Sequence, residues 1–311
     1  MIKRGFFLKM QQAVYDAIVI GAGPAGASCA VWLAHMGFSP LIIESSGRAG
    51  GLSASNPFED TWNVTAPGLT GEEVAARIKL SLDSARVPVL LNSHVTRIER
   101  EAAQQGGQEH FKVYFGADLP LHARYVVIAS GVEPRRPPEW EREAYDDVLV
   151  GPGKHVANYE FALKDVAILG GGDNAFENAL FLKERGAKSV HIYARTLRCQ
   201  RHWMKFLNES DITTGAYTFD PETRQVNGRS YDAVLVLYGF RARLQGMQDL
   251  GLDCNELGYV RTDFATTQTN LPGIYAIGEV THRQHPCVVT SMADGVVAAK
   301  AIQKQLEQGD A

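Results

Sequence analysis

Two glycine-rich turns of the same form constrain the fold of this chain more than any other feature. In the first, a short apolar run from Tyr15 to Ile20 enters Gly-Ala-Gly-Pro-Ala-Gly, and a helical stretch over 25–36 leads to a second apolar run, Pro40 to Ile43. Residues 166–193 repeat this order, with Gly-Gly-Gly-Asp-Asn-Ala as the turn. A strand, a glycine turn, a helix and a second strand form the βαβ unit that binds nucleotides. Two copies predict an α/β chain with two Rossmann-like, three-layer domains.

The composition excludes several other classes of protein. A length of 311 residues suits two domains, and 45% hydrophobic residues is too apolar for a disordered chain. No apolar run reaches the ~18 residues of a membrane-spanning helix, so no integral membrane segment is expected. The formal net charge of -4 gives no overall basic field for nucleic acid. The 4 cysteines include no Cys-x-x-Cys pair and no signal peptide precedes them, so a cytoplasmic location is expected.

The first turn is predicted to hold the diphosphate of an adenosine dinucleotide. Gly21 permits the tight turn, Gly23 lets the backbone approach a pyrophosphate, and Gly26 lets the helix pack closely on the strand. The diphosphate would lie at the helix N-terminus, where free N–H groups and the helix dipole favour negative charge. Glu44 follows the second strand and is placed to accept hydrogen bonds from ribose hydroxyls.

The second turn differs from the first at the end of its second strand. That strand ends in Ala194 and Arg195 rather than in an acid, and two more arginines come shortly after. Because an acid repels a 2′-phosphate and arginines bind one, this site is predicted to take NADP(H) or another phosphate-rich dinucleotide. The alternative is that the arginines form a solvated surface cluster. The residues predicted for this site are Gly170, Gly172, Asp173, Asn174, Arg195, Arg198 and Arg201.

Three further motifs accompany the glycine turns. They are Ala-Gly-Gly at 49–51, Val-Val-Ile-Ala-Ser-Gly at 126–131, and Asn-Leu-Pro-Gly-Ile-Tyr-Ala-Ile-Gly-Glu at 270–279. In this order and spacing the chain resembles the low-molecular-weight, thioredoxin-reductase-type flavoproteins. The resemblance implies FAD in a discontinuous domain of residues 1–133 and 243–311, with the second dinucleotide domain at 134–242.

The resemblance also assigns residues to FAD. Glu279 takes the place of an aspartate that bonds the ribityl chain in the family, and Val95 would place the adenine through its backbone. The full set that the resemblance assigns to FAD is Gly21, Gly23, Pro24, Ala25, Gly26, Glu44, Gly51, Leu52, Asn56, Val95, Ala129, Ser130, Gly131, Gly278, Glu279, Val288 and Val289.

The chain departs from the family pattern at the redox cysteines. Thioredoxin reductases carry a Cys-x-x-Cys pair just before the second glycine turn, and some relatives write it Cys-Pro-Tyr-Cys-His-Gly-Tyr-Glu. Aligned on Tyr159 and Glu160, the two cysteine positions are Gly153 and Val156 in this chain. Neither residue forms a thiolate, so the usual relay from flavin to disulfide is absent.

A cysteine stands instead at the flavin. In the family an Arg-Gln-Ala triplet opens the last helix and touches the isoalloxazine, and alignment on Thr290 and Ser291 puts Cys287 at the glutamine position. The last helix is predicted from about Ser291 to Glu307, and a helix N-terminus close to a thiol favours the thiolate. Cys29 is a tentative second sulfur for a disulfide with Cys287. The alternative for both is an unreactive, buried cysteine.

These observations predict an FAD-dependent oxidoreductase that exchanges electrons between flavin and thiols or disulfides through Cys287. One alternative is an NADPH:flavin reductase that passes electrons to a small or protein acceptor, and another is a non-catalytic flavin sensor. The second site is expected to hold NADP(H) or, as in a diflavin variant of the family, a second FAD. A small-molecule or protein thiol partner and a homodimer are expected. Metal is not expected, because the stretch from His282 to Cys287 lacks a fourth ligand.

Overall fold

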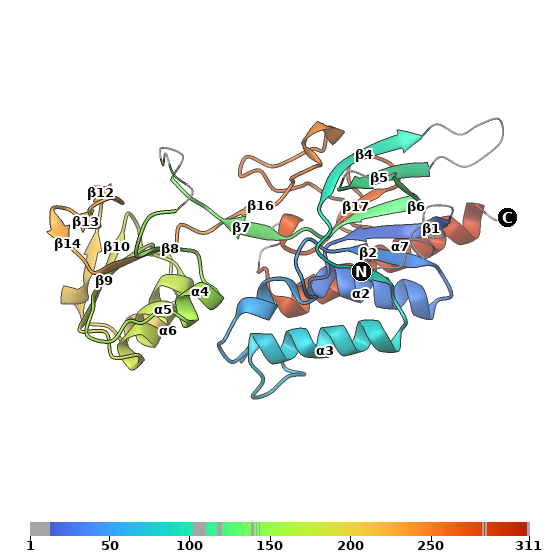
Figure 1. The fold of residues 1–311 in the computed structure, drawn as a ribbon. Coiled ribbons are helices and arrows are strands. Elements are labelled where there is room, and N and C mark those ends of the chain that lie inside the picture. The colour runs from blue at the N-terminus through green and yellow to red at the C-terminus, as the bar shows by residue number, and fades with distance from the viewer. Residues whose placement is uncertain are drawn as a thin grey trace. The chain divides into compact units, whose positions relative to one another are not determined.

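The computed structural model describes residues 13–101, 110–116, 120–137, 140, 142, 144–281, 283 and 285–309. It divides into two compact units (Figure 1). Unit 1 draws on residues 1–132 and 242–311, and unit 2 on residues 133–241. In each unit a glycine turn joins a strand of a parallel sheet to the helix that follows it. The predicted α/β fold with two Rossmann-like units is therefore confirmed.

The sheet of unit 1 has the strand order β3-β2-β1-β6-β5-β4, with β17 beside β6. β1, β2, β3, β6 and β17 are parallel, whereas β4 and β5 are antiparallel to their neighbours. β1 is buried over its last four residues, as expected for a strand with helices and chain on both faces. The bounds are β1 Val14–Ile20, β2 Pro40–Ile43, β3 Val89–Leu90, β4 Val95–Glu101, β5 His110–Phe115, β6 Leu121–Ile128 and β17 Ile274–Ala276.

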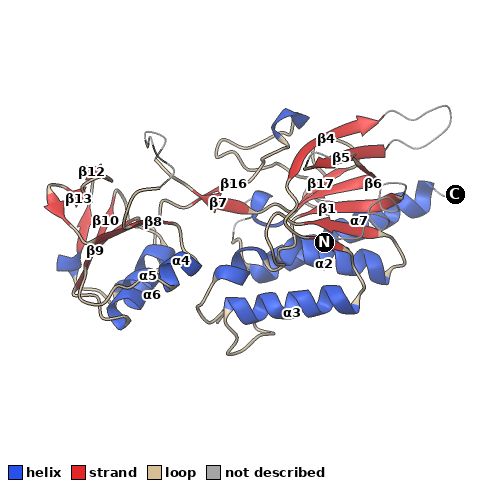
Figure 2. Ribbon diagram, viewed as in Figure 1, coloured by secondary structure: helices blue, strands red, loops and turns tan. Residues whose placement is uncertain are grey.

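Three helices lie on one face of this sheet (Figure 2): α2 (Pro24–His35), α3 (Gly71–Ser84) and α7 (Val288–Gly309). The buried core on that face includes Val19, Leu33 and Ile302, so α2 is held between the sheet and α7. Short 3-10 turns occur at η1 (Gly51–Ser55), η3 (Gln248–Leu250) and η4 (Gly278–Thr281). None of the described helices is long and apolar enough to cross a membrane.

Unit 2 contains a parallel sheet with the order β11-β10-β9-β15-β8 and a small antiparallel sheet, β12-β13-β14. Phe176 on α5 is fully buried against the parallel sheet, together with Ile168 and Leu235. The bounds are β8 Val148–Val150, α4 Lys154–Ala157, β9 Asp165–Leu169, α5 Asp173–Glu184, β10 Ser189–Ala194, α6 Arg201–Met204, η2 Glu209–Asp211, β11 Ile212–Thr214, β12 Phe219–Asp220, β13 Gln225–Val226, β14 Arg229–Ser230 and β15 Ala233–Val236.

The chain passes between the units at two places, for which the sequence predicts irregular linkers around 133–140 and 241–248. The structure corrects this in part, because β7 (Val132–Pro134) and β16 (Phe240–Ala242) pair there as a two-stranded sheet. Pairing satisfies backbone groups that a loop would leave to water. An ion pair between Arg241 and Glu133 (2.7 Å) lies on the same two strands.

Candidate functional site

The first glycine turn is held tightly on one side and is open on the other. The Gly21 N–H donates to the Ile43 carbonyl at 2.8 Å, and a Cβ added to Gly21 would lie 2.4 Å from the Ala129 oxygen. A Cβ on Gly26 would lie 2.0 Å from the Gly21 oxygen. A Cβ on Gly23, in contrast, would have no atom nearer than the Gly51 Cα, at 3.7 Å. Gly21 and Gly26 are therefore required by the fold, whereas the space at Gly23 is left for something other than protein.

Glu44 lies beneath this turn at the end of β2. It is 7% exposed, and its carboxylate accepts from the Ala22 N–H and the Ser46 N–H, both at 2.7 Å. The Glu44 carbonyl accepts from the Ser93 N–H at 2.9 Å, which places the chain before β4 beside it. Val95 begins that strand. The acid thus ties the turn, through Ala22, to the chain after β2, through Ser46, and keeps further lone pairs for a ligand.

The other residues predicted for FAD in unit 1 gather around the turn. Gly50 donates to the Ala22 carbonyl at 2.8 Å, and η1 with Gly51, Leu52 and Ser55 comes directly after it. The η1 turn ends at Asn56. Ala129 packs on Gly21 and Gly26, and the hydroxyl of Ser130 donates to the Arg243 carbonyl at 2.5 Å. The three motifs far apart in the sequence therefore meet at one end of the parallel strands.

η4 brings Gly278 and Glu279 to the same place. A Cβ on Gly278 would lie 2.8 Å from the Ala25 Cβ of α2, and Gly278 has a φ of +73° that favours glycine. Glu279 is half-buried and has no hydrogen bond or ion pair with another residue that the structure describes. Burial raises the pKa of the Glu279 carboxyl above its ordinary value. A carboxyl of this kind suits a hydroxyl-bearing ligand.

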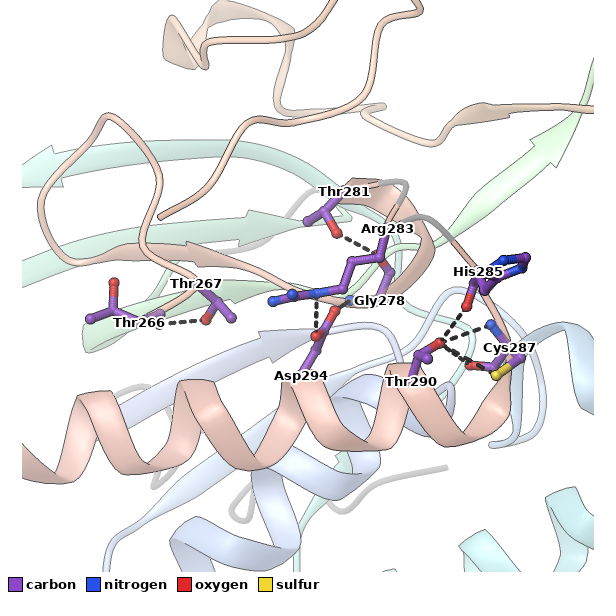
Figure 3. Close-up of polar contacts among 9 residues, drawn as sticks. All are labelled: Thr266, Thr267, Gly278, Thr281, Arg283, His285, Cys287, Thr290 and Asp294. Atoms are coloured by element: carbon purple, nitrogen blue, oxygen red, sulfur yellow. Dashed lines mark hydrogen bonds and ion pairs between the residues drawn. The ribbon is translucent and has the colours of Figure 1, made fainter. Parts of the chain in front are cut away.

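Cys287 is exposed and lies at the start of α7. The sequence places this helix start at Ser291, which is wrong by three residues, because Val288 is already helical. The reason is a local cap: the Cys287 N–H donates to the Thr290 hydroxyl at 3.0 Å, and the Ser291 N–H donates to the Cys287 carbonyl at 3.0 Å. The Cys287 sulfur lies 3.4 Å from the Thr290 hydroxyl oxygen (Figure 3). Cys287 is therefore the residue that caps the helix, and Val288 and Val289 form its first turn.

Cys29 is placed elsewhere. It is fully buried in the core between the sheet and α7, and burial raises the pKa of its thiol to about 12. A Cβ on Gly295 would lie 2.7 Å from the Cys29 nitrogen. Both cysteines are free, and Cys287 is exposed at the start of α7 whereas Cys29 packs beside Gly295, about two turns further along that helix. The structure does not bring the two sulfurs together, and the tentative pairing is corrected: Cys29 is a core residue.

The second glycine turn repeats the open geometry in unit 2. The Gly170 N–H donates to the Tyr193 carbonyl at 2.9 Å, and a Cβ on Gly172 would meet no atom within 4 Å. Asp173 begins α5, where its carboxylate accepts from the Gln200 N–H at 2.7 Å and from the Gln200 side chain at 2.9 Å. The Asn174 carbonyl accepts from Asn178 at 2.7 Å.

The three predicted arginines lie around this turn. The Arg198 N–H donates to the Gly171 carbonyl at 2.7 Å, so the loop after β10 closes on the turn. Arg195 directly follows β10 and Arg201 begins α6, and all three residues are exposed. Their backbone positions suit a phosphate carried at this edge of the sheet.

The two positions of the missing redox pair lie in unit 2. Gly153 caps α4, and Val156 is 2% exposed within the hydrophobic core. The second of these positions is therefore a packing position in this chain. Among the described residues no cluster of histidine, cysteine or acidic side chains could hold a metal ion, and His282 lies outside that part of the chain.

One buried side chain near η4 escaped the sequence analysis. Asp294 on α7 is 4% exposed, and its carboxylate accepts from the Gly278 N–H at 3.1 Å and from Arg283 Nε at 2.5 Å (Figure 3). Asp294 and Arg283 belong to none of the motifs, so the only sequence signal is an acid among the apolar positions of a predicted helix. That pattern predicts a buried charge but does not name its partner.

Fold and site together define an oxidoreductase with two dinucleotide-binding units, and comparison with known proteins gives the family. The model of the pyridine nucleotide-disulphide oxidoreductase family matches residues 15–295. The chain therefore belongs to this family of flavin-dependent enzymes.

Individual relatives are distant but cover nearly the whole chain. A thioredoxin reductase from Mycolicibacterium smegmatis is 26% identical, over 97% of this chain and 100% of that protein. A ferredoxin–NADP reductase from Limosilactobacillus fermentum is 27% identical over 94% of each. The crystal structure of Lactococcus lactis thioredoxin reductase matches with a TM-score of 0.77 and 24% identity, covering 94% of this chain and 99% of that one. The bacillithiol disulfide reductase from Staphylococcus aureus also matches with a TM-score of 0.77, at 18% identity. These relatives fit the thioredoxin-reductase-like resemblance of the sequence.

Proposed function

We propose that this enzyme exchanges electrons between FAD and the thiols or disulfides of a small molecule or protein, with Cys287 as its redox thiol. The observation that carries the proposal is the exposed Cys287 thiol at the start of α7, in the same unit as the open first glycine turn. The family acts on disulphides, and this chain has Gly153 and Val156 at the usual cysteine positions. A different sulfur must then serve any thiol chemistry.

The residues of unit 1 fit FAD. The space at Gly23 suits a diphosphate against the N-terminus of α2, where free N–H groups favour negative charge. Glu44 keeps lone pairs for ribose hydroxyls, and Glu279, which lacks a partner within the described chain, suits the ribityl hydroxyls. FAD, when bound there, supplies the two-electron acceptor or donor of the reaction.

Cys287 performs the sulfur chemistry in this proposal. When a partner thiol is oxidised, an S–S bond forms between Cys287 and the partner sulfur, two S–H bonds are lost, and the two electrons would pass to FAD as the two-electron acceptor, with the two protons taken up by the reduced cofactor and by solvent. A second partner thiol then attacks this bond and releases the partner disulfide, with Cys287 departing as a thiolate that regains a proton. Only one protein cysteine is needed, which agrees with the burial of Cys29.

For the second site we propose NADP(H) or a second FAD. The open space at Gly172 suits a diphosphate, and Arg195, Arg198 and Arg201 suit the 2′-phosphate of NADP(H). Ala194 and Thr196, on either side of Arg195, carry no charge, which leaves a second FAD as the alternative ligand. The flavin-to-protein ratio of the purified protein distinguishes the two: one per chain supports NADP(H) and two per chain supports the diflavin form.

A second candidate function is an NADPH:flavin reductase that needs no cysteine. It is favoured by the ferredoxin–NADP reductases among the relatives, which match as well as the thioredoxin reductases do. A non-catalytic flavin sensor is the third possibility and would show no steady-state turnover with any donor.

Comparison of wild type with Cys287→Ser tests the proposal. We expect FAD to stay bound, dithiol oxidation to be lost, and a broad long-wavelength charge-transfer band, present on partial reduction of the wild type, to disappear. Cys254→Ser is the matched control, because Cys254 is also exposed but does not lie at the start of α7. Unchanged spectra and unchanged dithiol turnover in Cys287→Ser would leave the NADPH:flavin reductase.

We further propose a homodimer in a reducing compartment such as the cytoplasm. Trp62 is 70% exposed and Val64 is 88% exposed, beside a cavity of about 530 Å³ between α2 and α3 that Trp32 and Leu69 help to line. Large exposed apolar side chains mark interfaces. The four cysteines are all free, which suits a reducing compartment. Light scattering of wild type and Trp62→Lys tests the dimer: a wild-type monomer contradicts it.

A further inference from the structure

Asp294 is a buried carboxylate with two ties to the stretch of chain between β17 and α7. Oδ2 accepts from the Gly278 N–H at 3.1 Å, and Oδ1 accepts from Arg283 Nε at 2.5 Å (Figure 3). The Asp294 side chain is 6% exposed and that of Arg283 is 27% exposed. One side chain of the helix therefore fixes the backbone at Gly278 and the guanidinium at Arg283.

The burial of this pair needs an explanation. A buried carboxylate is costly unless it is paired and hydrogen-bonded, and apolar residues would fill the same space at least as well. Arg283 has a further contact, since its guanidinium lies 5.2 Å from the centre of the exposed Phe264 ring. The pair is thus an oriented contact between two elements rather than a loose surface ion pair.

The two ties lie on either side of residues assigned to the chemistry. Gly278 is followed directly by Glu279, and Arg283 is followed within one turn's length of chain by Cys287. Asp294 itself lies about two turns after Cys287, on the same face of α7, because side chains at that spacing are stacked along a helix. The pair therefore connects the carboxyl beside the predicted ribityl chain with the thiol at the helix start.

We propose that Asp294 and Arg283 are positioning residues, which hold Glu279 and Cys287 in a fixed relation at one edge of the FAD site. Neither residue touches reacting atoms in this proposal. The inference rests on the proposed function only for the use made of Cys287. The position of the thiol, which is what the pair controls, is measured without reference to catalysis.

The test is a double-mutant cycle of Arg283→Met, Asp294→Asn and the double variant, in the FAD-loaded protein. Three quantities are measured: the Tm, the Kd for FAD, and the rate at which iodoacetamide alkylates Cys287, followed by mass spectrometry of its peptide. Each single variant leaves one buried charge without its partner, so we expect a lower Tm. We also expect several-fold slower alkylation, because the helix start no longer holds the exposed thiol in one position.

The double variant separates positioning from plain stability. It contains no unpaired buried charge, and the amide at position 294 still accepts from the Gly278 N–H, so the Tm and the Kd for FAD return towards wild type. The alkylation rate stays slow, because nothing ties the chain at position 283 to the helix. Alkylation that recovers together with the Tm, or that never changes, overturns the proposal.

Two further variants guard the interpretation. Asp83→Asn breaks the exposed Lys79–Asp83 pair (2.6 Å, both side chains more than half exposed) in the same unit and is expected to change none of the three quantities. Arg283→Lys keeps the charge, so it provides the comparison if Arg283→Met does not fold, and intermediate alkylation is expected. If Cys287→Ser retains dithiol turnover, the proposed function fails, but the alkylation cycle still decides whether the pair positions the thiol.

Discussion

The two glycine turns make matching backbone hydrogen bonds, but they differ in the residue that ends the neighbouring strand. Gly21 donates to Ile43, the last residue of β2, at 2.8 Å, and Gly170 donates to Tyr193, the last but one of β10, at 2.9 Å. Ala22 and Gly171 accept from the loops after these strands at 2.8 and 2.7 Å. The turns differ in the next side chain. In unit 1 a buried carboxylate bonds the turn, whereas in unit 2 the matching residue is Ala194, which offers no acceptor.

The acid of unit 2 is used in a different way. Asp173 stands on the helix and holds the loop through Gln200, and exposed arginines occupy that loop. The space at Gly23 and Gly172 suits a diphosphate in both units, and in our proposal the end of the second strand selects the ribose that each unit accepts. Substitutions at the glycines test whether both turns hold a diphosphate, and substitutions at the strand ends test whether the two units select different riboses.

The largest expected effect is at the open glycines. Gly23→Val is expected to abolish FAD binding, because the added side chain fills the space left for the diphosphate. The extended backbone that begins α2 there (φ -71°) accepts valine, so the Tm of the FAD-free protein should be nearly unchanged. The matching Gly172→Val should leave the flavin of unit 1 in place and remove the ligand of unit 2. Absorption spectra and released-cofactor chromatography measure both. Release of FMN from the wild type would contradict the assignment of the adenosine diphosphate.

Glu44→Gln tests the buried carboxylate at the end of β2, for which unit 2 has Ala194. The amide group of the variant faces an N–H donor in place of a carboxylate oxygen, so one of the two charge-assisted bonds is lost and a donor is left unsatisfied. We expect about 1.5–3 kcal/mol weaker FAD binding, because the charged acceptor proposed for the ribose hydroxyls becomes neutral. Titration of the FAD-free protein measures it. An unchanged Kd would mean that Glu44 only supports the chain around the turn and makes no contact with the ribose.

Arg195→Ala tests the exposed arginines that follow the second strand of unit 2. If unit 2 takes NADPH, the variant should bind NADPH about 1.5–3 kcal/mol more weakly and bind NADH nearly as the wild type does, because only the 2′-phosphate contact is lost. Stopped-flow reduction of the flavin with each nucleotide gives both values. Equal losses for the two nucleotides would place Arg195 outside the phosphate site.

A further expectation compares unit 2 with the relatives that carry the cysteine pair. Reduction of a thioredoxin with NADPH should be negligible, since Gly153 and the buried Val156 cannot form a disulfide. A relative with Cys-x-x-Cys, assayed in parallel, is the control. Comparable reduction by both proteins would show that another thiol pair replaces the relay.

The parts that could be predicted from the sequence are those set by local pattern. The buried parallel strands and the helices follow from the pattern of apolar residues, and the turns follow from glycines at positions that have no room for a side chain. Helix α3 was not predicted, although Thr70 and Glu73 form a capping box at its start. The start of α7 was placed three residues too late, because its cap is made by Cys287 and Thr290, which are not strong capping signals.

The remaining features depend on contacts between distant segments. The Asp294–Arg283 pair joins a helix to a turn whose path no local pattern specifies. The burial of Cys29 follows from the close approach of α2 and α7 at Gly295, which becomes visible only when the two helices are packed. For this reason the sequence names Cys29 as a partner for Cys287, although Cys29 lies in the core.

The smallest expected effect concerns Glu279, which has no counterpart in unit 2. Its pKa is raised by burial above the ordinary value of 4.5, so the folded protein holds the proton more tightly than the unfolded chain. The resulting stability is present below pH 4.5 and is lost as the pH rises through the raised pKa. Glu279→Gln stays neutral, so the FAD-free variant should have the wild-type Tm near pH 4 and a slightly higher Tm at pH 7–8.

Glu73→Gln should behave in the opposite way, because the pKa of Glu73 is lowered by its bond with the Thr70 backbone. That variant should match the wild type at low pH and melt earlier at neutral pH. The same shift in both variants would mean that Glu279 is not held in a desolvated place, and its role toward a hydroxyl-bearing cofactor would lose its physical basis.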